Sequence, residues 1–125
     1  MPPVPRSTAT GPGPIAPDGC AVEFYALIPD MGESRIVHEA AGPGASILEL
    51  GCGAGRVTRP LTALGHPVVA VDESPDMLAR VTGAQTVRSS VEELSLGRRF
   101  DAVLLSSNLI NVPDDHVRAA MLATC

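Results

Sequence analysis

The chain has 125 residues, enough for one small domain, with 45% hydrophobic residues and a formal net charge of −5. Only 2% of the residues are aromatic, so the core must be built mainly from aliphatic side chains. The acidic charge does not attract phosphate backbones and few rings are present to stack on bases, which argues against nucleic acid as a partner.

Cysteine usage and hydropathy restrict the class of protein further. Cys20, Cys52 and Cys125 have no paired spacing, which is typical of reduced thiols in a cytosolic protein. No apolar run approaches the roughly 18 residues that a membrane-spanning helix needs. We therefore expect a cytoplasmic protein that has no membrane partner.

The first part of the chain divides into a tail and two short helices. Residues 1–18 hold six of the twelve prolines and cannot form a core, so we expect a disordered tail there and a folded domain over residues 19–125. The pattern then becomes helical, and Pro29 divides it into residues 21–28 and 32–41.

The next segment contains the clearest alternation of elements. Residues 46–50 (SILEL) predict a buried strand, residues 51–55 (GCGAG) a glycine loop, and residues 56–64 a helix. Pro60 is compatible with that helix only if it begins near Val57, because the missing amide then falls in the first turn. Residues 68–71 (VVAV) predict a second strand.

The remaining elements follow the same order. Ser74, Pro75 and Asp76 predict a helix start, and that helix should run to about Val81. Residues 86–88 predict a weak third strand and residues 100–105 a fourth. A last helix should begin at Asp114, with its apolar face formed by Val117, Ala120 and Met121. Strands that alternate with helices predict an α/β fold with a parallel sheet.

The glycine loop is the main functional signal. Its alternating glycines let the chain turn tightly and let a ligand approach the backbone closely. A dinucleotide-binding loop would have a third glycine where Arg56 stands, and a phosphate-binding P-loop would be followed by Lys and Ser or Thr. Asp72 ends the second strand, where a carboxylate can accept both hydroxyls of a ribose. Together these features favour a nucleoside without a pyrophosphate.

ELGCGAGR followed by VVAVDESPDML resembles the class I S-adenosylmethionine-dependent methyltransferases over about residues 46–115. The resemblance implies a Rossmann-like, doubly wound parallel sheet in strand order 3-2-1-4, truncated after the fourth strand. It also implies that S-adenosyl-L-methionine is the cofactor and a small molecule the methyl acceptor, with no catalytic residue assigned. The implied cofactor-binding residues are Glu49, Gly51, Cys52, Gly53, Gly55, Asp72, Glu73, Met77, Ser90, Val91 and Ser106.

Other interpretations of these residues stay open. The glycine loop could be a plain strand-to-helix connection, and Met77 could be a core residue. Cys52 is expected to be a small loop residue and not a nucleophile, because no base is placed near it. The three histidines are expected to be solvated and to bind no metal. The chain could also be a non-catalytic fragment that binds the cofactor, and its fourth strand is expected to promote self-association.

Overall fold

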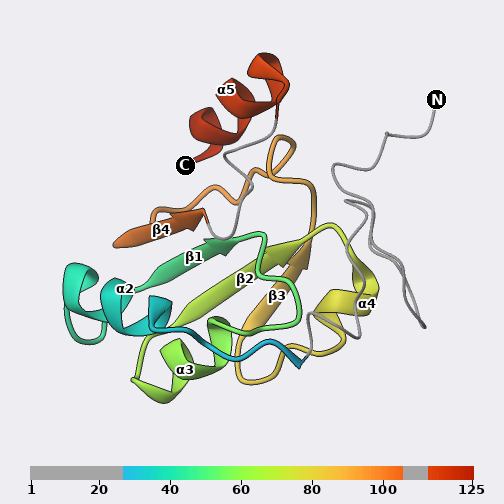
Figure 1. Ribbon diagram of the computed structural model, residues 1–125. Helices are drawn as coiled ribbons and strands as arrows, with labels where there is room; N and C mark the ends of the chain where they lie inside the picture. Colours follow the sequence, from blue (N-terminus) through green and yellow to red (C-terminus); the bar gives the residue numbers. More distant parts are fainter. Residues whose placement is uncertain (1–26, 106–112) are drawn as a thin grey trace.

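Four parallel strands organise the part of the chain that the computed structural model describes, residues 27–105 and 113–125 (Figure 1). The strand order is β3-β2-β1-β4, and all three neighbouring pairs are parallel. This confirms the predicted fold class and strand order. The predicted tail and most of the predicted helix at residues 21–28 lie outside the described residues. The strands are β1 Ile47–Leu50, β2 Val68–Asp72, β3 Gln85–Arg88 and β4 Ala102–Leu105.

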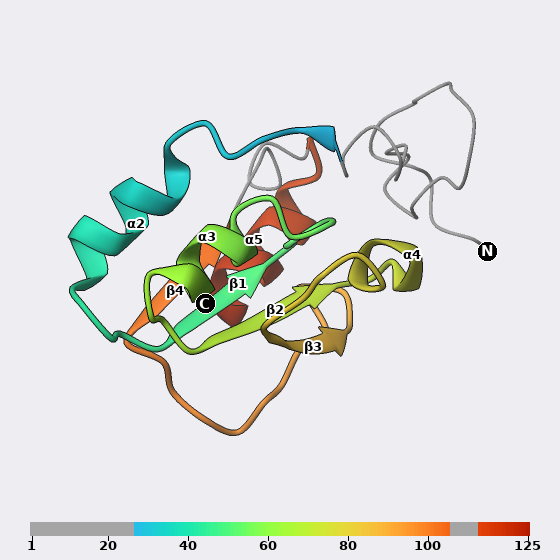
Figure 2. The ribbon, with the colours of Figure 1, turned by 90° about the horizontal axis from the view of Figure 1, so that it is seen from below.

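Helices cover both faces of the sheet, as a doubly wound fold requires (Figure 2). Helices α2 and α3 lie together on one side, and α5 lies on the other. Within the described ranges, none of the helices has both the length and the apolar character needed to cross a membrane. The helices are α2 Glu33–Ala41, α3 Thr58–Ala63, α4 Pro75–Leu78 and α5 Asp115–Thr124.

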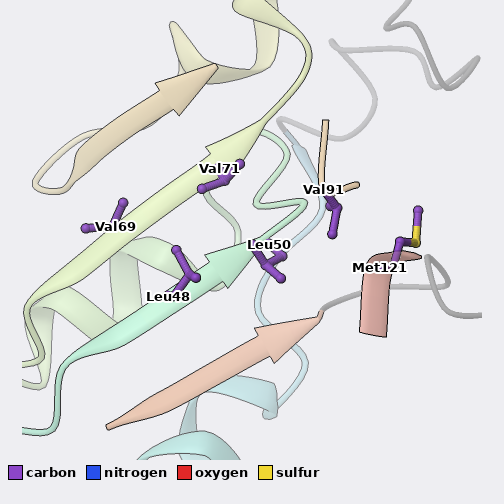
Figure 3. Close-up of a cluster of buried hydrophobic side chains, with 6 residues drawn as sticks. All are labelled: Leu48, Leu50, Val69, Val71, Val91 and Met121. Atoms are coloured by element: carbon purple, nitrogen blue, oxygen red, sulfur yellow. The ribbon is translucent and has the colours of Figure 1, made fainter. Parts of the chain in front are cut away.

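The two faces of β1 supply two separate hydrophobic clusters, because successive side chains of a strand point to opposite faces. Ile47 faces α3 and packs with Val57, Leu61 and Val68. Leu48 and Leu50 face the other way. They form the cluster drawn in Figure 3, whose members are Leu48, Leu50, Val69, Val71, Val91 and Met121. Met121 is fully buried, so α5 is held to the sheet by the side chain that the sequence predicted.

Local signals determine where two of the helices begin. Helix α3 begins at Thr58, which places Pro60 in the first turn, so the predicted reason for tolerating this proline is confirmed. Helix α4 begins as predicted: the Ser74 hydroxyl accepts a hydrogen bond from the Met77 amide at 3.2 Å, and Pro75 is the first helical residue.

The predicted end of the α4 helix at about Val81 is wrong. The helix ends at Leu78, and the next amides bond three residues back: Arg80 N–H to Met77 and Val81 N–H to Leu78. This tighter turn brings Val81 against the glycine loop, where its Cγ2 would lie 3.4 Å from a Cβ added at Gly55. The helix therefore stops where Val81 packs on the loop.

Strand β1 begins one residue later than the hydropathy pattern predicted, and β4 begins two residues later. Asp101 accepts hydrogen bonds from the Ser46 amide at 2.9 Å and hydroxyl at 3.1 Å, and its own amide donates to that hydroxyl at 3.0 Å. Ser46, just before β1, and Asp101, just before β4, are thus joined by bonds that use their side chains. They also hold the pKa of Asp101 below its usual value.

We expect the 125-residue chain to self-associate through β4. In the described part of the chain, β4 pairs with β1 alone and forms one edge of the sheet, and Val103 is 37% exposed there. Sedimentation velocity should show a mass that rises with concentration. Val103→Lys should weaken this association, because a charge on an edge strand opposes pairing with another chain.

Leu64→Lys is a matched control, because Leu64 is also exposed (46%) but lies at the end of α3. A monomer at all concentrations, with the β4 amides strongly protected from exchange, would show that this strand is covered and the prediction wrong.

Candidate functional site

Most of the predicted site residues lie at or just after the carboxyl ends of the strands, which all point the same way (Figure 1). We refer to the side of the sheet formed by these carboxyl ends as this edge. Leu50 of β1 stands beside Val71 of β2, and Asp72 stands beside Arg88 of β3. The loops that follow these strands are therefore neighbours, at the position where open α/β sheets bind ligands. Ser106, which follows β4, lies outside the described residues.

The glycine loop has a backbone shape that side chains disfavour. Gly51, Gly53 and Gly55 have φ values of 73°, 57° and 90°. The amides of Gly51 and Cys52 both donate to the carbonyl of Val71, at 2.8 and 2.9 Å, so the loop is tied to β2. A Cβ added at Gly53 would meet nothing within 4 Å, whereas one at Gly55 would be in van der Waals contact with Val81, 3.4 Å from its Cγ2. Gly53 thus marks an open surface on the loop, and Gly55 marks its packed side.

Asp72 is connected directly to this loop. Its Oδ2 accepts a hydrogen bond from the Gly53 amide at 3.0 Å, and its Oδ1 accepts one from the Ser74 amide at 2.9 Å. The half-buried carboxylate is therefore held in one orientation by donors from both sides. A carboxylate has about four positions that can accept hydrogen bonds, so it can accept donors from a ligand in addition to backbone amides.

Glu49 is a second carboxyl group at this edge, and it is fully buried. Its side chain accepts hydrogen bonds from the Thr58 hydroxyl at the start of α3. The pKa of Glu49 is raised to about 7. Burial is the main cause and the Asp72 charge a minor one, whereas the Thr58 hydrogen bond and the Arg56 charge act in the opposite direction. Glu49 therefore changes its charge near neutral pH.

Cys52 is buried beside these two acids. Burial raises the pKa of its thiol strongly, and the charges of Glu49 and Asp72 act in the same direction. A thiol with a raised pKa is a poor nucleophile, which supports the prediction that Cys52 is a small loop residue. Its sulfur lies 3.4 Å from the Gly53 carbonyl.

We predict that iodoacetamide at neutral pH alkylates Cys52 at least about tenfold more slowly than Cys125, which is exposed. Peptide mapping by mass spectrometry gives both rates in one sample. The same reaction in urea is the control, because unfolding removes the burial that protects Cys52. Similar native rates at the two positions would contradict the geometry described for the loop.

The segment after β3 completes the described part of this edge. The Ser89 amide donates to the Asp72 carbonyl at 3.1 Å, so Ser89 and Ser90 lie next to the end of β2. Among residues 27–105 and 113–125, the buried Ser90 hydroxyl has no hydrogen-bond partner, which is unusual for a polar atom. The side chains of Val91 and Met77 are buried at 7% and 3% exposure, and Val91 belongs to the cluster in Figure 3. Glu73 is partly exposed.

Sequence reasoning missed two partners of the loop. Thr58, which bonds Glu49, stands nine residues after it, and Glu33 of α2 binds Arg56 from 23 residues earlier. The Arg56 guanidinium and the Glu33 carboxylate form an ion pair at 2.6 Å. The polar residue at the first turn of α3 was a usable signal for Thr58. No local pattern could have paired Glu33 with Arg56.

The prediction that His66 is solvated is wrong. It is 3% exposed, because its Nδ1 lies 2.9 Å from the Ala45 carbonyl and its Nε2 lies 2.7 Å from Nδ1 of His38. Both contacts depend on the tertiary fold. His116 is exposed, as predicted. Among residues 27–105 and 113–125, no group of three or more histidine, cysteine or acidic side chains could hold a metal ion.

Comparison with known proteins places this geometry in a family. The model of the methyltransferase domain family matches residues 47–125. A ubiquinone biosynthesis O-methyltransferase of Xanthomonas campestris pv. campestris (strain B100) is 32% identical over 108 residues, which cover 78% of this chain and 44% of that protein.

Solved structures agree with the sequence comparison. The glycopeptide N-methyltransferase MtfA complexed with S-adenosyl-L-methionine has a TM-score of 0.69 and 28% identity, with 78% of this chain and 49% of that chain covered. The 1,6-didemethyltoxoflavin-N1-methyltransferase of Burkholderia thailandensis, with bound 1,6-didemethyltoxoflavin and S-adenosylhomocysteine, has a TM-score of 0.61 and 30% identity, covering 75% and 44%.

The chain thus spans less than half the length of each of these proteins. The family model covers well over half of the chain, however, and the matched residues include the glycine loop and all four strands of the sheet. The chain therefore belongs to the class I S-adenosylmethionine-dependent methyltransferases.

Proposed function

We propose that the edge of the sheet formed by the glycine loop and Asp72 binds S-adenosyl-L-methionine, and that the protein transfers its methyl group to a small-molecule acceptor. The observation that carries this proposal is the bond between the Asp72 carboxylate and the Gly53 amide. It holds a ribose-binding acid beside a loop whose surface at Gly53 is open. We further expect the protein to act in the cytoplasm.

The residues present fit each part of the cofactor. The open backbone at Gly53 suits a ligand that lies directly on the loop, and Gly51 and Cys52 belong to the same turn. Asp72 suits the two ribose hydroxyls. The Ser90 hydroxyl lies close to the end of β2 and is buried without a partner among the described residues, so it suits a polar atom of adenine.

The other predicted residues have more limited roles in this proposal. Glu49 is buried beneath the loop and suits a cation, such as the ammonium group of the methionine part. Glu73 and Met77 flank the adenosine, with Met77 also part of the core. The Val91 side chain is buried in the core, so the backbone of Val91 is the part suited to contact adenine. Gly55 acts through packing on Val81, and Ser106 stays a prediction.

For methyl transfer, the main task of the protein is to position the cofactor and the acceptor. When bound, the cofactor supplies a methyl group on a positively charged sulfur, which is already activated for transfer. The chain's own residues must bind the nucleoside, orient the sulfur toward the acceptor and exclude water. The relatives named above act on oxygen and nitrogen of different small molecules, which supports a small-molecule acceptor without choosing its atom.

Calorimetry with S-adenosylmethionine and S-adenosylhomocysteine tests the proposal, on the 125-residue chain and on any longer natural form of the protein. Binding is the expected result, and no binding at millimolar ligand would refute the cofactor assignment. Binding without methyl transfer to any acceptor would instead support the other hypothesis, a fragment that binds the cofactor without catalysis.

A further inference from the structure

Arg56 connects the end of the glycine loop to Glu33, the first residue of α2. Its guanidinium Nη1 donates to the Glu33 carboxylate at 2.6 Å, and its side chain is only 18% exposed, compared with 41% for Glu33. The hydrogen bond from Arg56 is the main reason why the pKa of Glu33 lies below its usual value. The ion pair is therefore partly shielded from solvent, where a charge–charge contact is stronger than on an open surface.

Glu33 also organises the chain ahead of α2. Its Oε2 accepts a hydrogen bond from the Met31 amide at 2.8 Å, while its Oε1 binds Arg56. Asp30 accepts bonds from the Gly32 amide at 3.1 Å and from the Ser34 amide and hydroxyl. Side-chain bonds thus fix the chain from Asp30 to Ser34. Figure 2 shows the segment ahead of α2 passing beside the loop that follows β1.

The glycine loop does not depend on Arg56 for its own shape. Its amides bond Val71 and Asp72, and the Arg59 guanidinium donates to the Ala54 carbonyl at 3.1 Å. The contact that Arg56 adds is the one to Glu33, on an element 23 residues earlier in the sequence. Its charge is also close enough to lower the pKa of Glu49 beneath the loop.

We propose that Arg56 is a positioning residue of the cofactor site: its ion pair with Glu33 fastens the start of α2 and the segment ahead of it beside the glycine loop, where that segment forms a wall of the site. This inference rests on the proposed function. It assigns a role to the residue that stands where a dinucleotide-binding loop would have its third glycine.

Two single variants and their combination test whether the ion pair affects binding by holding the segment ahead of α2 in place. At a pH well above the Glu49 pKa of about 7, Glu33→Gln and Arg56→Gln should each weaken S-adenosylhomocysteine binding roughly fivefold, and the double variant should be little worse than either. Each should also speed amide exchange over residues 31–36. Arg35→Gln is the matched control, because Arg35 pairs with Glu39 on the exposed face of α2 and should change neither quantity.

The pH dependence distinguishes Arg56 from a purely structural residue. Thr58, Arg56, Asp72 and Cys52 are the polar and titratable groups around Glu49. Arg56→Gln removes the only cation among them and should move the pH midpoint of binding upward, whereas Glu33→Gln keeps that cation and should not. The exchanged pair Glu33→Arg with Arg56→Glu should restore slow amide exchange without restoring affinity at pH 7.

The outcomes separate this inference from the proposed function. If the parent chain binds no S-adenosylhomocysteine, the proposed function fails and this role fails with it. If the parent binds while Glu33→Gln and Arg56→Gln bind equally well, with residues 31–36 exchanging as before, the cofactor assignment stands and the role of Arg56 is wrong.

Discussion

Asp72→Ala is expected to weaken S-adenosylhomocysteine binding by about 30-fold or more. Two charge-assisted hydrogen bonds to the ribose hydroxyls are together worth on the order of 2–4 kcal/mol, and 2 kcal/mol corresponds to roughly 30-fold in affinity. The structure supports this magnitude, because the Gly53 and Ser74 amides hold the carboxylate in place before a ligand arrives. Calorimetry on the parent and the variant measures the ratio directly.

The same two amides create a second way in which the variant could lose affinity. Without the carboxylate, the Gly53 amide loses its acceptor and the loop itself could shift. Comparing adenosine with 2′-deoxyadenosine separates the two effects. If Asp72 binds the ribose, the loss caused by Asp72→Ala should be smaller for the deoxy ligand, whereas a loop effect should be equal for both.

Asp76→Ala is the matched control, because Asp76 is an exposed acid four residues away in the first turn of α4. It removes one negative charge from the same region without removing a bond to the loop. Unchanged binding by Asp72→Ala would show that the ribose lies elsewhere. An equal loss for adenosine and 2′-deoxyadenosine would limit Asp72 to organising the loop.

Local signals allowed the sequence to predict the framework of this site. The Ser74 cap, the first-turn position of Pro60 and the glycines of the loop each depend on neighbours within a few residues. The strand order followed from the resemblance, and the register then placed Asp72 beside the loop. For that reason the elements and most of their starts agree with the structure.

The errors all involve contacts between distant residues. His66 is buried because Ala45 and His38 supply partners from 21 and 28 residues away, and a polar residue between Gly65 and Pro67 gives no local sign of this. The α4 helix ends early, at Leu78, and the turn that follows it places Val81 beside Gly55, 26 residues earlier in the chain. The Glu33–Arg56 ion pair has the same origin, so composition and periodicity could not reveal it.

Glu49→Gln is expected to change binding and stability in opposite directions. A carboxyl group with a pKa of about 7 is largely neutral below that pH, so a ligand that needs the carboxylate must displace a proton there. Affinity for S-adenosylhomocysteine should therefore fall as pH decreases below 7 in the parent, by at most about tenfold per pH unit, and depend little on pH in Glu49→Gln. At pH 8 the variant should bind more weakly than the parent.

The ligand 5′-methylthioadenosine is the control for this effect, because it keeps the nucleoside and lacks the ammonium group that Glu49 is proposed to attract. Its affinity should be nearly independent of pH and nearly equal in parent and variant. Glu39→Gln provides a protein control, because Glu39 is an exposed acid on α2. A pH dependence that is the same for both ligands would place the ammonium group away from Glu49.

The sign of the stability effect follows from the direction of the pKa shift. The unfolded chain has Glu49 near its ordinary value of 4.5, and burial raises the folded value to about 7, so the folded state holds more protons between these values. Stability from this group is fully present below pH 4.5 and is lost as pH rises to 7, by about 3 kcal/mol in total.

Asp30, Glu33 and Asp101 have lowered pKa values and act in the opposite direction, so the pH dependence of the parent's stability mixes these effects. The difference between the parent and Glu49→Gln isolates Glu49, because the other groups are common to both. Urea unfolding from pH 4.5 to 8 should show Glu49→Gln gaining stability relative to the parent as pH rises, with most of the change below pH 7. A difference that stays constant over this range would mean that Glu49 is ionised throughout, and the proton displacement expected on binding would then be absent as well.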